Sequence, residues 1–516
     1  MNFITNAAQR CVPAEINGEP AVPFQGIGKF KPTGRTAGRP IVSCADFPSD
    51  GDKIVVDLRT ALEQCGLKDG MTISTHHHFR DGDLIANQVF DIAAEMGVTN
   101  LRWFPSAAFP CHAPLIKHLE SGVIHHIEGS MNGPLGDYCS EGRMRGTAVL
   151  RSHGGRWQAV QDGEVHIDIA VLAAPVADAF GNCNGALGPS ACGPLGYAEA
   201  DVQFADKVIV VTDYLVPFPC YPWHLQGQYV DCVVVVDKIG IPEKILSGTT
   251  KLTKSPDRLR IAELIAQFAE AAGFIRNGFS FQTGAGGISL AFTSYLEDIM
   301  RRKNIQASFY LGGSNALPVK MLEDGLIDKI VDIQAFDLEA VRSTRDNPSH
   351  IACGPFTTYN YHGKGNFNTL TDITVLGATE VDVDFNANVV THSDGRLKHG
   401  IGGWQNCLFA KCSVLAVPSF RDRIPVIVKS VTTLCGPSEL VDVVVTERGI
   451  CINPRRQDLL DAVKGTSLPI IDIHDLQQTV EKICGIPEPP NVSDEVVAVV
   501  KWVDGTVLDC VYAVRS

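Results

Sequence analysis

From about residue 53 onward, hydrophobic and polar residues follow helical and extended patterns in turn. Apolar residues recur at helical spacing over Leu58–Gly66 and Ile85–Met96, and a glycine closes each stretch. Short apolar runs bounded by turn residues lie around them, at Met71–Thr75, Leu101–Phe104, Ile167–Leu172, Val208–Val211 and Val230–Val236. Such β-branched runs are typical of buried parallel strands. The pattern therefore predicts an α/β fold, with mostly parallel sheets and flanking helices.

The second half of the chain resembles the first. Residues 168–184 return as residues 372–388 without a gap, so that Asp372 matches Asp168 and Asn386 matches Asn182. This spacing is far longer than the roughly 20–50 residues of solenoid repeats. It predicts an internal duplication that gives two similar α/β domains, with a ligand cleft between them.

The predicted organisation has three parts. Residues 1–52 form an N-terminal arm, since Gly26–Pro40 is rich in Gly, Pro and basic residues without periodicity, which indicates an irregular segment able to wrap a partner. Domain 1 spans residues 53–250 and domain 2 spans residues 251–516, with a polar junction between them. The chain ends in a predicted hairpin that turns at Asp504-Gly505.

Composition narrows the class of protein. The 516 residues carry a formal net charge of −14, which does not favour a nucleic-acid surface. The 16 Cys form no CxxC pair and are spread along a long chain, which indicates free thiols in the cytoplasm. The first residues lack the pattern of a signal peptide, and no apolar run approaches the ~18 residues of a membrane helix.

The strongest local motif is a glycine-rich turn between a predicted strand and a predicted helix. It begins with Gln282, a candidate substrate contact, and continues through the candidate catalytic residues Gly284, Ala285, Gly286 and Gly287. Backbone N–H groups at such a turn can hold a phosphate or the oxyanion of an acyl-transfer intermediate. A tight turn that needs glycine for geometry alone explains the motif equally well.

In the first half, the corresponding turn contains His76, His78 and Arg80 in place of glycines. If both turns face one cleft, Arg80 can grip a carboxylate with two hydrogen bonds. His76 and His78 share a strand face and could bind a metal, but no carboxylate or Cys completes a ligand set, so we predict no metal. These histidines could also serve only to satisfy backbone groups of the loop.

Further candidate contacts lie outside these two turns. His153 and Arg156 belong to a small basic, Gly-rich cluster that could meet phosphates or carboxylates, or form a solvated turn. Asn386 and Asn388 are candidate substrate contacts, although asparagines at such positions also form turns. Glu380, which shares an extended face with Asp382, is a fallback nucleophile.

Six segments together resemble the alpha subunit of bacterial citrate lyase. They are Asp50–Arg59, His76–Asp83, Cys111–Leu115, Ser152–Arg156, Phe180–Gly185 and Gln282–Gly287. The resemblance extends from about residue 50 to the C-terminus and implies two CoA-transferase-like domains. It implies transfer of a thiol carrier from acetate to citrate, which gives acetate and a citryl thioester.

The resemblance also implies partners. A gamma subunit, the acyl carrier protein, would supply a dephospho-CoA-type prosthetic group, for which a CoA thioester can substitute. A beta subunit would cleave the citryl thioester, and the chain would act within an oligomer without a tightly bound cofactor of its own. Arg80 and a histidine of residues 76–78 would hold citrate, and the amides around Gly284–Gly287 would stabilise the oxyanion.

One departure from the wider CoA-transferase superfamily bears on the mechanism. Many of its members use a glutamate nucleophile after a strand, whereas the comparable segment here, Phe309–Asn315, contains no Glu. We therefore expect direct attack by citrate through a mixed anhydride. The alternatives are another carboxylate CoA-transferase or an acyl-CoA hydrolase that uses a glutamate, and a non-catalytic scaffold or sensor.

Overall fold

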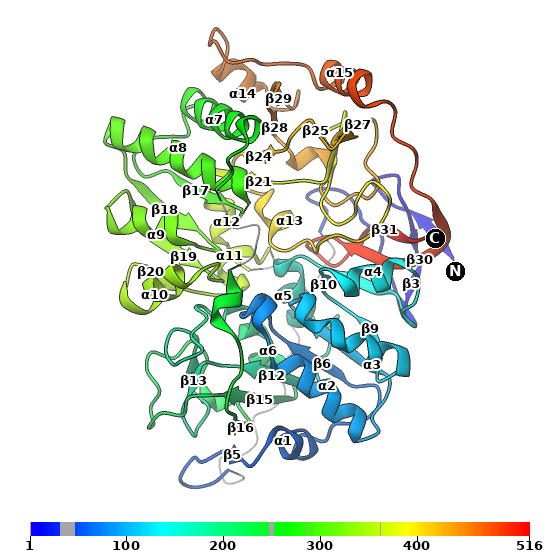
Figure 1. Cartoon of the computed structure of the whole chain (residues 1–516), viewed down its shortest axis with the longest axis vertical. Coiled ribbons are helices and arrows are strands. Elements are labelled where there is room, and N and C mark those ends of the chain that lie inside the picture. The colour runs from blue at the N-terminus through cyan, green and yellow to red at the C-terminus, as the bar shows by residue number, and fades with distance from the viewer. Residues whose placement is uncertain (1, 31–46, 247–251, 285, 362, 516) are drawn as a thin grey trace.

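The computed structural model describes residues 2–30, 47–246, 252–284, 286–361 and 363–515. Two large sheets occupy opposite ends of the long axis of the molecule, and short helices lie between them (Figure 1). The predicted α/β fold with mostly parallel sheets and flanking helices is confirmed. No helix in the described part of the chain is both long and apolar enough to cross a bilayer.

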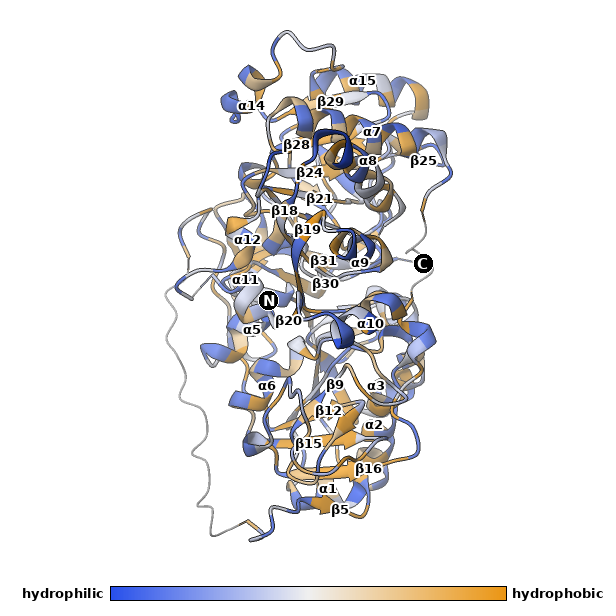
Figure 2. Cartoon of the chain, turned by 90° about the vertical axis from the view of Figure 1, so that its left-hand side faces the viewer, coloured by the Kyte–Doolittle hydropathy of each residue, from blue (hydrophilic) through white to orange (hydrophobic). Residues whose placement is uncertain are grey.

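The first sheet has seven strands, and all of them pair in parallel. Their order is β5 (Ile54–Val55), β16 (Cys232–Val235), β15 (Lys207–Thr212), β12 (Ile169–Ala173), β6 (Thr72–Thr75), β7 (Leu101–Pro105) and β9 (Ile124–Ile127). Helices α1 (Leu58–Gln64), α2 (Ile85–Glu95) and α3 (Ile116–Ser121) flank it (Figure 1). Several of its strands are strongly hydrophobic (Figure 2), as expected for strands covered on both faces.

The second sheet has eight strands, and only β28 and β29 pair in an antiparallel manner. Their order is β20 (His350–Ala352), β19 (Ile327–Asp332), β18 (Ala307–Leu311), β17 (Ser280–Thr283), β21 (Ile373–Leu376), β24 (Ser413–Ala416), β28 (Val443–Thr446) and β29 (Gly449–Ile452). Helices α7 (Pro256–Ala271) and α8 (Gly287–Lys303) lie side by side against it (Figure 1).

The two sheets share one strand order. The series β16-β15-β12-β6-β7-β9 corresponds to β28-β24-β21-β17-β18-β19. The repeated stretch forms β12 and the short hairpin β13 (Val176–Ala177)–β14 (Cys183–Asn184) in one half. In the other half it forms β21 and the hairpin β22 (Glu380–Asp382)–β23 (Ala387–Asn388). The duplication remains a prediction, and the equal strand order favours it.

The two ends of the chain meet beside the first half. The predicted C-terminal hairpin is present as β30 (Val492–Lys501) and β31 (Val507–Val514), and β30 pairs with β11 (Ala148–Leu150) of the first half. The side chain of Asn6 donates hydrogen bonds to two carbonyls of β31, at 3.0 and 2.8 Å. Figure 1 shows both termini at this hairpin.

The predicted N-terminal arm contains regular structure over residues 3–20. These residues form the short strands β1 (Phe3–Thr5), β2 (Cys11–Pro13), β3 (Glu15–Ile16) and β4 (Glu19–Pro20). Val12 and Ile16 are buried in one apolar cluster with residues of β11, β30 and β31. Pairing and burial against the distant C-terminus stabilise the segment, and its local sequence does not show this. Residues 31–46 lie outside the described residues, as does part of the predicted junction at 247–251.

A buried ionic network joins β9, β11 and β30. Glu128 contacts Arg151 at 3.3 Å, Arg102 at 3.4 Å and His126 at 3.4 Å. Arg151 and Lys501 both contact Glu164 at 3.0 Å. Burial alone would raise the pKa of Glu128, but His126 and the two guanidinium groups outweigh it and lower the pKa to about 2.

We expect Glu128→Gln to destabilise the protein by about 3 kcal/mol at neutral pH. The reason is that the pKa of Glu128 is about 2 in the folded protein and near its ordinary value in the unfolded chain. A folded pKa below the unfolded one gives stability that is present above about pH 4.5 and is lost as pH falls toward about 2. Denaturant midpoints measured from pH 7 to pH 3 should therefore fall more steeply for wild type than for the variant. Parallel curves with equal midpoints would contradict the prediction.

Candidate active site

A cavity of about 300 Å³ lies between the two halves of the chain. Residues that follow β6 and residues of α5 (His153–Gln161) line it from the first half. From the second half, residues of the turn after β17 and of the segment before α13 (Trp404–Cys407) line it. Helices α5 and α13 both lie in the layer between the two sheets (Figure 1). The carboxyl ends of parallel strands are the usual place for a ligand in α/β sheets, and here two such edges meet.

Arg80 is the most unusual side chain of the cavity. Its Nε and Nη1 atoms are buried and have no hydrogen-bond partner among the described residues. The guanidinium carbon lies 5.6 Å from the ring centre of Phe109 and 4.9 Å from that of Phe336. Burial lowers the pKa of Arg80, yet a guanidinium remains charged in proteins. A buried cation without a protein counter-ion is a strong candidate to bind an anionic ligand.

The three consecutive histidines at residues 76–78, here called the histidine run, point to different sides of the chain. His77 lines the cavity, whereas His76 and His78 do not. Alternation along an extended segment explains this division, since successive side chains point to opposite sides. His76 Nε2 lies 2.7 Å from an Asp201 carboxylate oxygen, and neither ring nitrogen of His78 has a partner among the described residues. The sequence prediction selected the two histidines that point away from the cavity.

His77 is held as a neutral ring. It stacks on Tyr197 with ring centres 4.4 Å apart, and its Nδ1 lies 2.6 Å from Ser106 Oγ. Burial and the neighbouring His153 lower the pKa of His77 well below its ordinary value. Burial and then Arg156 lower the pKa of His153, which also lines the cavity, to about 3. Both imidazoles can therefore offer hydrogen bonds at neutral pH without adding charge.

Arg156 has a structural contact in place of the predicted substrate contact. Its two terminal nitrogens grip the Asp201 carboxylate at 2.8 and 2.7 Å, and one of them also donates to the Phe104 carbonyl at 3.1 Å. Burial would raise the pKa of Asp201, but Arg156 and His76 outweigh it and lower the pKa. The Arg156–Asp201 pair does not line the cavity, and Asp201 also contacts His76 at the start of the histidine run.

The glycine-rich turn after β17 meets the cavity only in part. Gln282 and Gly284 line it, whereas Gly286 and Gly287 do not. Gly286 is the N-cap of α8, and Gly287 is its first residue. The N–H of Gly284 donates to the Val375 carbonyl at 3.1 Å, so it is not free to stabilise an oxyanion. Ala285 lies outside the described residues.

The predicted asparagine contacts belong to a hairpin turn. Asn386 Nδ2 donates to an Asp382 carboxylate oxygen at 3.2 Å, and Asn388 Nδ2 donates to Glu380 at 2.9 Å. Glu380 also accepts hydrogen bonds from the backbone and hydroxyl of Thr432, at 2.8 and 3.0 Å. None of these residues lines the cavity. Their arrangement supports the turn-forming interpretation that the sequence left open.

A second glycine-rich segment, missed from the sequence, does line the cavity. It runs from His399 through Gly400, Ile401, Gly402 and Gly403. Within the described chain, the N–H groups of residues 400–403 have no hydrogen-bond partner. Free amides that line a cavity can stabilise a negatively charged oxygen. The sequence His399-Gly-Ile-Gly-Gly-Trp404 could have predicted this segment, because its closely spaced glycines indicate a turn with accessible amides, as they do at residues 284–287.

Comparison with known proteins identifies the family. A family model described as citrate lyase, alpha subunit (CitF), matches residues 51–514. The chain belongs to the citrate lyase alpha-subunit family. The citrate lyase alpha chain of Klebsiella pneumoniae is 42% identical over 466 residues, which cover 90% of this chain and 92% of that one. The family resemblance predicted from the six segments is confirmed, and with it the assignment of the chain to an enzyme.

Solved structures agree with this assignment. The alpha subunit of citrate lyase from Streptococcus mutans, solved in complex with citrate, superposes with a TM-score of 0.93 at 40% identity and covers 99% of this chain and 100% of its own. A malonate decarboxylase alpha subunit from Acinetobacter baumannii superposes at 0.59 with 17% identity, over 84% of this chain and 88% of its own. The second likeness shows a common fold with a wider group of proteins.

Proposed function

We propose that this citrate lyase alpha subunit transfers a thiol carrier from acetate to citrate. The observation that carries the proposal is Arg80, whose guanidinium atoms Nε and Nη1 are buried in a cavity between the two halves without a hydrogen-bond partner among the described residues. A volume of about 300 Å³ suits a small polycarboxylate. The bound citrate of the Streptococcus mutans relative supports the same ligand.

The proposed reaction has two acyl-transfer steps. A citrate carboxylate attacks the carbonyl carbon of the acetyl thioester, and the tetrahedral intermediate expels the thiolate to leave a citryl-acetyl anhydride. The thiolate then attacks the citryl carbonyl and expels acetate, so one thioester is exchanged for another. Both intermediates place negative charge on a carbonyl oxygen, and the free amides of residues 400–403 are our candidates to stabilise it.

The cavity supports direct attack by the substrate. Among the described residues that line it, none carries a carboxylate. The fallback nucleophile Glu380 is held by Asn388 and Thr432 outside the lining. We therefore propose that citrate itself is the nucleophile and that no glutamyl-enzyme intermediate forms.

The proposal includes the partners implied by the family. A gamma subunit would supply the acetylated dephospho-CoA-type group, and a beta subunit would cleave the citryl thioester within a cytoplasmic oligomer. The carrier arm would reach the cavity from solvent, since the cavity is too small to enclose it together with citrate. Acetyl-CoA would replace the acylated carrier in the isolated chain.

The test combines purified chain, acetyl-CoA and citrate. We expect citryl-CoA and acetate in equal amounts, measured by mass spectrometry, and no acetate release without citrate. Acetate release that does not need citrate would favour an acyl-CoA hydrolase. No turnover with either acetyl-CoA or the acetylated carrier protein would favour a scaffold.

A separate prediction concerns the covalent glutamyl-enzyme thioester, which we propose does not form. Borohydride, added with acetyl-CoA, should leave activity unchanged, because no enzyme-bound thioester forms for it to reduce. A CoA-transferase of the wider superfamily that uses a glutamate nucleophile would be inactivated, and this serves as the positive control. Inactivation that requires acetyl-CoA and modifies Glu380 would overturn the direct-attack mechanism.

A further inference from the structure

The cavity contains two oxygen atoms that no step of the proposed reaction uses. Among its described lining residues, those with buried side-chain atoms that lack a hydrogen-bond partner are Arg80, Ser130 and Gln282. Ser130 is 4% exposed and Gln282 is 7% exposed. The guanidinium of Arg80 can only donate, whereas Ser130 Oγ and Gln282 Oε1 can accept. Because buried polar atoms nearly always have a partner, we expect a bound ligand to supply a donor to these oxygens.

Ser130 lies against the glycine-rich segment of residues 400–403. It belongs to β10 (Ser130–Met131), a short strand of the first half that pairs with β8 (Ala107–Ala108). A Cβ at Gly400 would lie 1.6 Å from Ser130 Oγ and 2.7 Å from Ser130 Cα, so only a residue without a side chain leaves room for this hydroxyl. The contact places an acceptor of the first half beside the free amides of the second half.

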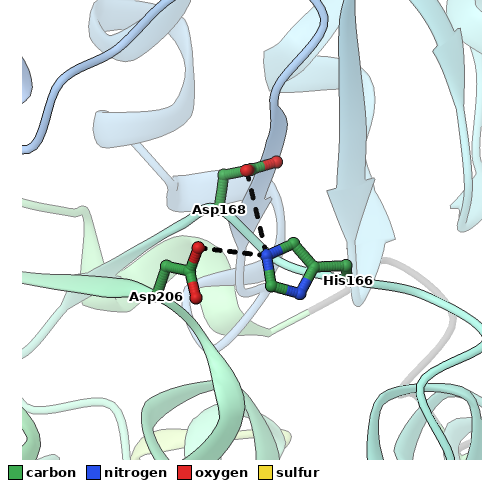
Figure 3. Close-up of side chains that lie close together, drawn as sticks. All are labelled: His166, Asp168 and Asp206. Carbon is green, nitrogen blue, oxygen red and sulfur yellow. Dashed lines mark hydrogen bonds and ion pairs between the residues drawn. The ribbon is translucent and has the colours of Figure 1, made fainter. Parts of the chain in front are cut away.

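A polar cluster elsewhere in the first half shows the contrast. At the amino ends of β12 and β15, His166 Nε2 lies 3.1 Å from Asp206 Oδ2 and 3.9 Å from Asp168 Oδ1 (Figure 3). Asp168 also accepts a hydrogen bond from the backbone of Thr72 at 2.7 Å. The polar groups of that cluster have partners within the protein, so they need no ligand, unlike the two oxygens of the cavity.

The chemistry of citrate indicates what such an acceptor can bind. At neutral pH its carboxylates are mostly ionised, and an ionised carboxylate only accepts hydrogen bonds. The tertiary hydroxyl is the donor of the molecule, and it stands on the carbon β to the carboxylate of each acetate arm. If the carbonyl oxygen of one activated arm lies at the amides of residues 400–403, the hydroxyl lies within reach of an acceptor beside those amides.

We propose that Ser130 Oγ accepts the hydrogen bond of the substrate hydroxyl and thereby selects citrate over tricarboxylates that lack this group. The inference rests on the proposed function, because it assumes that citrate binds in this cavity with its reacting carbonyl at residues 400–403. A site built to pair with a hydroxyl rejects an analogue without one, because its own polar group then stays buried and unpaired. Ser130 is in this view a specificity-determining residue, with no part in proton transfer.

Selection at this step would serve the reaction of the beta subunit. Cleavage of the citryl thioester breaks the bond between the carbon that bears the hydroxyl and the methylene next to the thioester. The hydroxyl loses its proton as it becomes a ketone, and the methylene takes up a proton. A thioester made from a tricarboxylate without the hydroxyl could not be cleaved in this way and would stay on the carrier. Recognition by Ser130 would therefore keep the carrier free for repeated transfer.

The test compares citrate with tricarballylate, the same tricarboxylate without the hydroxyl, by isothermal titration calorimetry on the full chain. We expect wild type to bind citrate about tenfold more tightly, because the analogue leaves a buried hydroxyl unpaired. Ser130→Ala should reduce this preference to about twofold or less, mainly by weakening the binding of citrate. The ratio of the two affinities is the readout, because a structural defect would weaken the binding of both ligands alike.

Two further variants serve as controls. Ser343→Ala removes a buried hydroxyl of α10 (Leu338–Asp346) that has no partner among the described residues and does not line the cavity, so it should keep the wild-type ratio. Gln282→Met removes the other unpaired oxygen of the cavity at similar side-chain length. It should keep the preference for citrate, whatever its effect on either affinity alone.

Each unexpected result has a definite meaning. Equal binding of the two ligands to wild type would overturn the inference, and so would a wild-type ratio in Ser130→Ala. Loss of the preference in Gln282→Met alone would assign the substrate hydroxyl to Gln282 instead. In these cases, citrate-dependent formation of citryl-CoA would leave the proposed function intact. Wild type that binds neither ligand would overturn both the inference and the proposed function.

Discussion

Arg80→Gln is expected to lower kcat/KM for citrate by about 30-fold or more, because loss of one partner from a buried charge pair costs about 2–5 kcal/mol. The guanidinium atoms Nε and Nη1 have no hydrogen-bond partner among the described residues, and we expect the ligand to be that partner. The change should appear mainly in the KM for citrate, with the KM for acetyl-CoA unchanged. Initial rates with each substrate varied in turn provide the measurement.

Two further variants separate ligand binding from structure. Arg80→Lys keeps the charge but loses the planar fork, so it should retain part of the activity. Arg342→Gln is the control. Arg342 lies on α10 (Leu338–Asp346) and forms exposed ion pairs with Glu339 of the same helix and with Glu323, so the change should leave activity unchanged. The Tm of Arg80→Gln should match that of wild type. Equal losses for both substrates, together with a lower Tm, would show that Arg80 has a structural role only.

Gly400→Ala is expected to lower kcat by about 10²–10³-fold, the effect of losing one oxyanion donor. A Cβ at Gly400 would overlap the Oγ and Cβ of Ser130 and would lie 2.7 Å from its Cα, so the backbone of the segment must shift. The KM for citrate should change little, because the amides act on the intermediates more than on the bound substrate. The double variant Gly400→Ala/Ser130→Gly should recover part of kcat, since it removes the two atoms that overlap most.

A variant of the glycine-rich turn after β17 decides which of the two glycine-rich segments forms the oxyanion site. A Cβ at Gly286 has nothing within 4 Å, so the side chain of Gly286→Val starts in open space and places bulk beside the amides of residues 286–287. If residues 400–403 form the oxyanion site, Gly286→Val keeps kcat near that of wild type. A large loss in Gly286→Val, with normal kcat in Gly400→Ala, would assign the oxyanion site to residues 286–287.

The local spacing of apolar residues was sufficient to predict many helices and strands of the fold. The helices at Leu58–Gly66 and Ile85–Met96 and five of the seven strands of the first sheet lie within a few residues of their predicted bounds, whereas β5 and β9 were not predicted. These elements were predictable because their apolar residues have one clear period and their ends carry glycines. The N-terminal strands were not predictable, because they are stabilised by β11 and by a hairpin at the other end of the chain.

The residues of the candidate site were likewise predicted from the sequence only in part. Arg80, His153, Gln282 and Gly284 were predicted, and all four line the cavity. The prediction named His76 and His78, which do not line the cavity. Period-two alternation selects either His77 or its two neighbours, and only the packing of the halves shows which side faces the cavity. The binding roles of all these residues remain predictions.

The sequence by itself determined the family, the α/β class and the presence of a cationic turn and a glycine-rich turn, because motifs and periodicity are local properties. The tertiary structure alone decided which groups are free to act. It pairs Arg156 with Asp201 and occupies the amide of Gly284, whereas two guanidinium atoms of Arg80 and the amides of residues 400–403 have no hydrogen-bond partner in the described parts of the chain. Whether a polar group can act on a ligand depends on which partner it has already found, and those partners come from segments far apart in the chain.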